Sequence, residues 1–306
     1  MGKNRKRIKR KELFKDGINI NPILFSFIVL FLFLIPFIIS YYFTFEYIKR
    51  SEAVSVREEA EYLSKNTVSE NELNNLYKNY KNNNQVIILG YHQIREINNQ
   101  DTEKEKLFIT SPKVFEEEMK YLKDNNYTSI SITEYINFLK DQIKNPIPKK
   151  SIIITFDDGY ISQYQNAFYI LKKYNMTDTF FIYADCIDKY PVCMTSHNLK
   201  DLTNNNMKLS NHTFHHAYLT DYKDNTIKNE IEKNQDFLES FGEENVEKVL
   251  AYPYGVTDER VKNIVKDLKY LGGVGVSFYA KDENDIFNLP RYLLGDKIDN
   301  FYNLLK

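Results

Sequence analysis

The chain has 306 residues, of which 42% are hydrophobic and 27% charged, and its formal net charge at pH 7 is −1. This length is sufficient to bury one sizeable core and to carry a second, smaller module. A net charge near zero gives no argument for nucleic-acid binding, so no nucleic-acid partner is expected.

The N-terminal region has a sharp division of charge and hydropathy. Residues 1–17 contain eight Lys/Arg, whereas residues 23–45 are uncharged over 23 positions, enough for a helix to cross a hydrocarbon core of roughly 30 Å. The preceding cations favour a cytoplasmic N-terminus. We therefore expect a basic cytoplasmic tail at 1–22, a transmembrane signal anchor at 23–45, and an extracellular remainder at the cell membrane. A cleaved signal peptide, with "SEA" at 51–53 as a weak cleavage site, is the alternative and would make the protein secreted.

Alternating strand-like and helix-like segments follow a charged, Asn-rich stalk at 46–84, and they predict one folded domain over 85–306. The expected strands are 86–91, 128–132, 151–156, 179–184, 207–212, 248–255 and 273–278. The expected helices are 114–122, 133–143 with Thr133 as its N-cap, 164–174, 199–202, 225–241 and 258–270. Strands separated by helices predict a parallel α/β sheet or barrel, in which functional side chains gather where strands end.

The two cysteines, Cys186 and Cys193, lie in an expected loop. Outside the membrane they could form a disulfide, and two unpaired surface thiols are an equally weighted alternative. A thiol metal site is disfavoured, because the C-x6-C spacing does not match the usual C-x2–4-C pattern.

Polar motifs follow four of the expected strands. They are "GYH" (90–92), "DDG" (157–159), "NHTFHH" (211–216) and "YPYG" (252–255). His212 and His216 share one face if the chain turns helically after the strand, and His212 with His215 offers a similar geometry. Two imidazoles and one carboxylate suit Zn²⁺ or a neighbouring transition metal, and a solvated polar loop is the alternative.

The adjacent carboxylates Asp157 and Asp158 can have different roles, because successive side chains at a strand end point in different directions. One can bind a cation while the other moves a proton. An acidic turn, helped by a positive φ at Gly159, is the alternative. A phosphoacceptor aspartate is disfavoured by the expected placement outside the cell.

The segments "TFDDGY", "NHTFHH" and "YPYG", in this order and spacing, resemble the motifs of the polysaccharide deacetylases, also called NodB-homology or carbohydrate esterase family 4 enzymes. The resemblance covers most of residues 85–295. It implies a distorted (β/α)7 barrel that binds a divalent metal through an Asp-His-His triad and removes N-acetyl groups from amino sugars.

Site roles follow from this resemblance, position by position. Asp157 is expected to be the general base. The expected ligands of a divalent metal, foremost Zn²⁺ with Co²⁺ or Ni²⁺ as alternatives, are Asp158, His212 and His216. His215 is then a bystander. The oxyanion is expected to lie on the metal and a backbone N–H near Tyr254, beside Pro253.

The chain departs from the commonest family pattern in two places. No His follows His216, although many members have a catalytic His near the C-terminus, and Ala251 stands where an Arg is common. Yet "ILGYHQI" at 88–94 resembles the branch that deacetylates the biofilm polymer poly-β-1,6-N-acetylglucosamine, where a Tyr-His near the start supplies the acid. That branch also tends to contain "AYPYG".

The resemblance to this branch makes His92 the expected general acid, with Tyr91 beside the substrate. A buried histidine bonded to backbone is the alternative for His92. Arg291 is the candidate to offset negative charge near Asp157 in place of the absent Arg, and a surface arginine is the alternative.

We therefore expect a membrane-anchored, metal-dependent N-deacetylase of an extracellular N-acetylglucosamine polymer, foremost the β-1,6-linked polymer of biofilm matrix. The expected partners are this polysaccharide, the membrane, and exopolysaccharide synthesis and export machinery. A peptidoglycan deacetylase and, more weakly, an acetylxylan esterase are alternative enzymes. A catalytically silent carbohydrate-binding member of the family is the alternative of a different class, which the joint presence of base, acid and metal ligands disfavours.

Overall fold

The computed structural model describes residues 86–141 and 144–305. The expected cytoplasmic tail, signal anchor and stalk lie outside these residues. None of the helices within the described ranges is long and apolar enough to cross a membrane.

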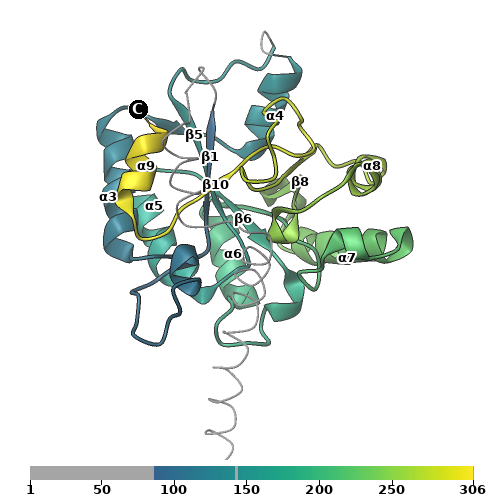
Figure 1. The fold of residues 1–306 in the computed structure, drawn as a ribbon, viewed down its shortest axis with the longest axis horizontal. Coiled ribbons are helices and arrows are strands. Elements are labelled where there is room, and N and C mark those ends of the chain that lie inside the picture. The colour runs from purple at the N-terminus through teal and green to yellow at the C-terminus, as the bar shows by residue number, and fades with distance from the viewer. Residues whose placement is uncertain (1–85, 142–143, 306) are drawn as a thin grey trace, which may run out of the picture. The chain divides into compact units, whose positions relative to one another are not determined.

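An all-parallel sheet forms the centre of the described domain (Figure 1). Its strands, in spatial order, are β10 (Tyr292–Leu293), β1 (Ile87–Tyr91), β5 (Ser151–Phe156), β6 (Thr179–Ile182), β7 (Lys208–Asn211), β8 (Val246–Ala251) and β9 (Gly272–Val274). A short strand, β4 (Thr128–Ser129), pairs with the beginning of β5. A separate parallel pair joins β2 (Gln93–Ile94) and β3 (Ile109–Thr110). This arrangement is a parallel-sheet half-barrel α/β fold, which fits the expected deacetylase type. Within the described residues the end strands β10 and β9 do not pair with each other, so the expected barrel is not closed.

Helices connect the strands and cover the sheet. They are α3 (Pro112–Asp124), α4 (Ile132–Lys140), α5 (Phe168–Tyr174), α6 (Ser196–Asn204), α7 (Asp224–Glu239), α8 (Glu259–Asp267) and α9 (Ile298–Leu304). A π-helical turn, Gln163–Ala167, leads into α5, and single 3-10 turns occupy Glu105–Phe108, Ala184–Cys186, Leu219–Asp221, Glu243–Asn245 and Pro253–Gly255. In Figure 1, α3, α5 and α9 lie together on one side of the strands, and α7 and α8 lie together on the other.

The expected strand at 128–132 is wrong beyond Ser129. Its alternating pattern suggested a strand, but Ser131 forms a capping box with Glu134: its hydroxyl accepts from the Glu134 N–H at 3.1 Å, and Glu134 Oε2 accepts from the Ser131 N–H at 2.7 Å. The helix therefore begins at Ile132, and Ser131 rather than Thr133 is its N-cap. Four strands also end earlier than expected: β6 ends at Ile182, β7 at Asn211, β8 at Ala251 and β9 at Val274.

The apolar run of β5 is unbroken because both faces of the sheet are buried. Ile153 packs in one cluster with Ile88 of β1, whereas Ile152 and Ile154 pack on the opposite face with residues of α3, α5 and α6. Side chains alternate between the two faces along a strand. Continuing this alternation past the end of β5 places Asp157 on the Ile153 face, inside the curve of the sheet.

Candidate active site

The candidate side chains come together where the parallel strands end. His92 follows β1, Asp157 and Asp158 follow β5, and His212 follows β7. Arg291 directly precedes β10, which pairs with β1. All five side chains are buried, together with that of His216. The strand ends therefore build one enclosed polar site in an otherwise apolar interior.

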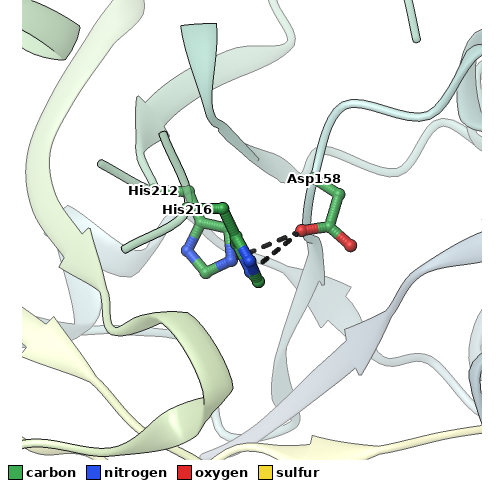
Figure 2. Close-up of side chains that lie close together, drawn as sticks. All are labelled: Asp158, His212 and His216. Atoms are coloured by element: carbon green, nitrogen blue, oxygen red, sulfur yellow. Dashed lines mark ion pairs between the residues drawn. The ribbon is translucent and has the colours of Figure 1, made fainter. Parts of the chain in front are cut away.

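Three of these residues form a compact group of metal-ligand type. Asp158 Oδ1 lies 3.6 Å from His212 Nε2 and 3.4 Å from His216 Nε2, and one donor atom from each residue lies within 4.8 Å of the others. Figure 2 shows both imidazoles turned toward the same carboxylate oxygen. A carboxylate and two imidazoles converging in this way are a donor set for a divalent transition metal.

The surroundings of the two imidazoles fit that role. His212 Nδ1 lies 2.8 Å from the carbonyl oxygen of Ala251, so a proton on Nδ1 leaves the Nε2 lone pair facing Asp158. His216 Nε2 is buried and makes no hydrogen bond within the described part of the chain. Burial, reinforced by neighbouring His212, lowers the pKa of His216 well below its usual value. The His216 ring is thus suited to bind a cation as a neutral ligand, and the His212 ring is oriented to offer its Nε2 to the same cation.

The loop after β7 differs from the helical turn that the spacing suggested. Thr213 (φ 63°) and His216 (φ 56°) adopt left-handed backbone conformations, and no helix follows β7 directly. Asn211 Oδ1 accepts a hydrogen bond from the Thr213 N–H at 2.8 Å and fixes the start of this turn. The turn brings His212 and His216 together, with ring centroids 4.9 Å apart.

His215 lies outside this group, as expected for a bystander. Its Nδ1 lies 2.7 Å from Glu230 Oε1, its N–H donates to Glu230 Oε2 at 2.9 Å, and half of its side chain is exposed. His215 is therefore not a member of the group of potential metal ligands, and His212 is grouped with His216 instead. His215 instead attaches the loop to α7.

Asp157 and Arg291 form a buried bidentate ion pair. The two terminal nitrogens of Arg291 donate to Asp157 Oδ1 at 2.5 Å and Oδ2 at 2.6 Å, and Arg291 Nε donates to the carbonyl of Gly275. Burial alone would raise the pKa of Asp157, but Arg291 outweighs it, with help from His212 and His92, and holds the pKa well below its usual range. Asp157 is therefore ionised at any physiological pH.

His92 faces the same carboxylate. Its Nε2 lies 4.0 Å from Asp157 Oδ2, and its ring packs edge-on against Phe108. Gln163, from the π-helical turn, donates from Nε2 to the carbonyl oxygens of both His92 (2.8 Å) and Asp157 (2.5 Å). Gln163 thus ties the ends of β1 and β5 together; it belongs to none of the motifs, and nothing in the sequence singled it out.

Tyr91 is not placed at the site, contrary to the sequence-based expectation. It is fully buried, stacks against Phe156, and donates from its hydroxyl to Glu118 Oε2 at 2.8 Å. Adjacent residues of a strand point to opposite faces, so placing His92 in the site turns Tyr91 away from it. Burial raises the pKa of Glu118 to about 8.

Tyr254, which follows Pro253 in the turn after β8, lies beside His216. Tyr254 has a left-handed backbone (φ 61°) and its ring lies 4.6 Å from that of His216. The ring of Tyr218 stacks in parallel on Tyr254, with centroids 3.5 Å apart. Tyr254 therefore packs against both the His216 imidazole and Tyr218.

Comparison with known proteins identifies the domain. Residues 144–272 match the family described as polysaccharide deacetylase. The chain carries a polysaccharide deacetylase domain. This domain belongs to a hydrolase family whose members depend on a metal, in agreement with the Asp-His-His group described above.

Two curated relatives and one solved structure illustrate the extent of the deacetylase similarity. YxkH of Bacillus subtilis (strain 168), named for the same family, is 28% identical over 187 residues, covering 61% of this chain and 63% of YxkH, which is less than two thirds of that relative. The poly-beta-1,6-N-acetyl-D-glucosamine N-deacetylase of Staphylococcus aureus (strain MSSA476) is 27% identical over 254 residues, covering 74% of this chain and 83% of the relative. The Streptococcus pyogenes deacetylase PplD, solved in complex with acetate, shares the fold with a TM-score of 0.64 at 24% identity, covering 72% of this chain and 98% of PplD.

Proposed function

We propose that this protein is a metal-dependent N-deacetylase that hydrolyses the acetamido groups of poly-β-1,6-N-acetylglucosamine. The observation that carries the reaction type is the meeting of two proton-transfer groups, Asp157 and His92, beside the Asp-His-His group. A protein that only binds carbohydrate has no use for a buried carboxylate held ionised next to an imidazole.

The reaction requires two proton transfers, for which the chain offers one group each. A water oxygen attacks the acetyl carbonyl carbon, and Asp157 accepts the proton that this water loses. The C–N bond then breaks, His92 donates a proton to the leaving nitrogen, and acetic acid and a free amine result. The acid ionises to acetate in water, and return of the proton from Asp157 to His92 restores both groups. The distance of 4.0 Å between His92 Nε2 and Asp157 Oδ2 lets both groups face one bound acetamide.

Arg291 has two opposing effects on the proposed base. It keeps Asp157 charged and oriented, but it also makes the carboxylate a weaker proton acceptor. A divalent cation, for which we propose Zn²⁺ held by Asp158, His212 and His216, would polarise the acetyl carbonyl and acidify the attacking water, which compensates for the weak base. We further assign the backbone N–H near Tyr254, beside Pro253, to the carbonyl oxygen of the substrate.

The choice of substrate rests on the sequence. The S. aureus relative is named for activity on poly-beta-1,6-N-acetyl-D-glucosamine. The chain also has the early Tyr-His of "ILGYHQI" and the "AYPYG" segment expected for enzymes of that polymer. Removal of acetyl groups exposes amines that are cationic near neutral pH and that bind anionic cell surfaces.

The proposed location follows from the N-terminal charge and hydropathy. The uncharged stretch at 23–45, preceded by eight cations, supports a single-pass anchor with the deacetylase domain outside the cell. In this position the protein would meet its polymer at the membrane, next to exopolysaccharide synthesis and export machinery.

The test is an assay of the full-length protein, loaded with Zn²⁺, on β-1,6-linked N-acetylglucosamine oligomers, with counting of released acetate and free amines. Wild type should release acetate, and Asp157→Asn should release at least a hundredfold less. Peptidoglycan in a parallel reaction tests the substrate: faster release from it would replace the proposed polymer. If wild type releases no more acetate than Asp157→Asn from either substrate, the proposed activity is wrong.

A further inference from the structure

A disulfide lies directly behind the proposed metal site. Cys186 and Cys193 are joined, with Cα atoms 5.9 Å apart, and both are buried. They close a loop within residues 184–194, which we call the bridging segment. The sequence left open whether the two cysteines pair, and it gave no reason to connect them with the histidines or with Asp158.

The bridging segment contacts the Asp158 loop on both sides of the disulfide. Sγ of Cys186 lies 3.6 Å from the carbonyl oxygen of Asp158, the Met194 N–H donates to Gly159 O at 2.9 Å, and the Ile161 N–H donates to Val192 O at 2.7 Å. Cys186 and the two neighbours of Cys193 therefore contact successive peptide groups of this loop. The disulfide holds Cys186 next to Cys193 and so keeps both sets of contacts formed at the same time.

The same segment also contacts the histidine loop. The Asp185 N–H donates to the carbonyl oxygen of Phe214 at 3.0 Å, between the two histidine ligands. The Ala184 N–H donates to Asn234 Oδ1 at 2.9 Å, and Asn234 Nδ2 donates to Asn211 Oδ1 at 3.0 Å. The bridging segment is thus linked to the loops that carry all three ligands.

These loops need support from outside because their backbones are unfavourable on their own. Asp158 (φ 74°), Thr213 (φ 63°) and His216 (φ 56°) are non-glycine residues in left-handed conformations. Such conformations persist only where surrounding contacts enforce them. Two of the three residues are proposed ligands, so loss of those contacts would release ligand atoms first.

We propose that the Cys186–Cys193 disulfide is a positioning element of the metal site, which holds Asp158 in place relative to His212 and His216. This inference rests on the proposed function in one respect, since it takes these three residues as the metal ligands. It makes high metal affinity dependent on an oxidised bridge, and hence on an environment in which disulfides persist.

The competing explanation is that the disulfide only stabilises the fold by restricting the unfolded chain. The two explanations differ in what they predict for the folded protein. A bridge that acts only on the unfolded chain changes the melting temperature but leaves the dissociation constant of the folded protein for Zn²⁺ unchanged. A positioning bridge raises that dissociation constant at temperatures where the protein is fully folded.

The experiment measures Zn²⁺ affinity by competition with a chromophoric chelator, using four preparations of the full-length chain. They are oxidised wild type, wild type made in a reducing cytoplasm with two free thiols per chain, Cys186→Ala/Cys193→Ala, and the control Lys189→Ala. Lys189 lies in the bridging segment, but its side chain is exposed, and its ammonium group pairs with Asp185 and lies over the ring of Tyr190. Thermal unfolding of each metal-free preparation establishes the temperature range in which it is folded.

Reduced wild type and the double alanine variant should bind Zn²⁺ at least tenfold more weakly than oxidised wild type. The dissociation constant of Lys189→Ala for Zn²⁺ should lie within twofold of that of oxidised wild type. The reduced wild type decides the question if the variant does not fold. An unchanged dissociation constant in either folded preparation overturns the proposal, and so do two free thiols in protein made under oxidising conditions. Affinity does not depend on the substrate, so wild type that fails to deacetylate but loses affinity on reduction would contradict the proposed function alone.

Discussion

Replacement of Arg291 by methionine should destabilise the fold strongly, because it leaves the Asp157 carboxylate buried without a counter-ion. Only 1% of Arg291 and 2% of Asp157 is exposed. Two charge-assisted hydrogen bonds are lost, at 2.5 and 2.6 Å, each worth about 1.5–3 kcal/mol. Their sum agrees with the roughly 3–5 kcal/mol observed when one partner of a buried ion pair is removed.

Urea unfolding of the metal-free protein at pH 7, followed by circular dichroism, measures this loss. Arg291→Lys is the matched control: it keeps the charge but loses the bidentate geometry, so its free energy of unfolding should lie between those of wild type and Arg291→Met. Asp157→Asn completes a double-mutant cycle, in which we expect a coupling energy of about 2 kcal/mol. The prediction is refuted if the free energy of unfolding of Arg291→Met lies within about 1 kcal/mol of the wild-type value. It is also refuted if the effects of the two substitutions add within about 0.5 kcal/mol.

Three further predictions address the acid, a buried carboxyl group and the metal. His92→Ala should lower kcat on N-acetylglucosamine oligomers by roughly 10²–10⁴ with zinc content unchanged; loss of zinc would instead make His92 a ligand. The pKa of Glu118 is about 8 in the folded protein against an ordinary 4.5, so the folded state keeps a proton that the unfolded state has lost between these values. Glu118 should therefore lower the stability as pH rises from about 4.5 to about 8, by at most about 1.4 kcal/mol per pH unit, and Glu118→Gln should reduce the slope in urea titrations by this contribution; an identical slope in both proteins would contradict the assignment. His212→Ala should reduce bound zinc by at least tenfold, and chelation should abolish wild-type acetate release until Zn²⁺ is restored; release that survives chelation would argue against metal dependence.

The edge of the sheet that carries the proposed ligands could be predicted from the strand topology, whereas the choice of His216 over His215 came from the resemblance to the family motifs. Asp157 and Asp158 follow an unbroken apolar strand, and His212 follows another strand. In a parallel sheet these positions lie at the same edge. The sequence also suggested Arg291 as a counter-ion, and the structure places it against Asp157. The identity of the metal and the catalytic roles of these residues remain predictions.

The features that the sequence did not predict depend on contacts between distant parts of the chain. Whether Cys186 and Cys193 pair is decided by the folding of the loop between them, not by their spacing. Gln163 acts through two carbonyl groups on different strands, which no local pattern reveals. β10 and α9 are too short to produce a periodic signal. The alternation of side chains along β1 predicts that Tyr91 points away from His92. The Tyr-His motif instead led to the expectation that both residues lie at the site.

The pairing of β10 with β1 has a consequence for the order in which the site is completed. Figure 1 shows the last strand of the domain beside the first, although almost the whole domain separates them in the sequence. A growing polypeptide acquires its proposed acid first, its base and metal ligands next, and the arginine partner of the base after all of these. A chain that ends before Arg291 lacks the counter-ion of its proposed base, so the proposed site is complete only after residue 291 has been added.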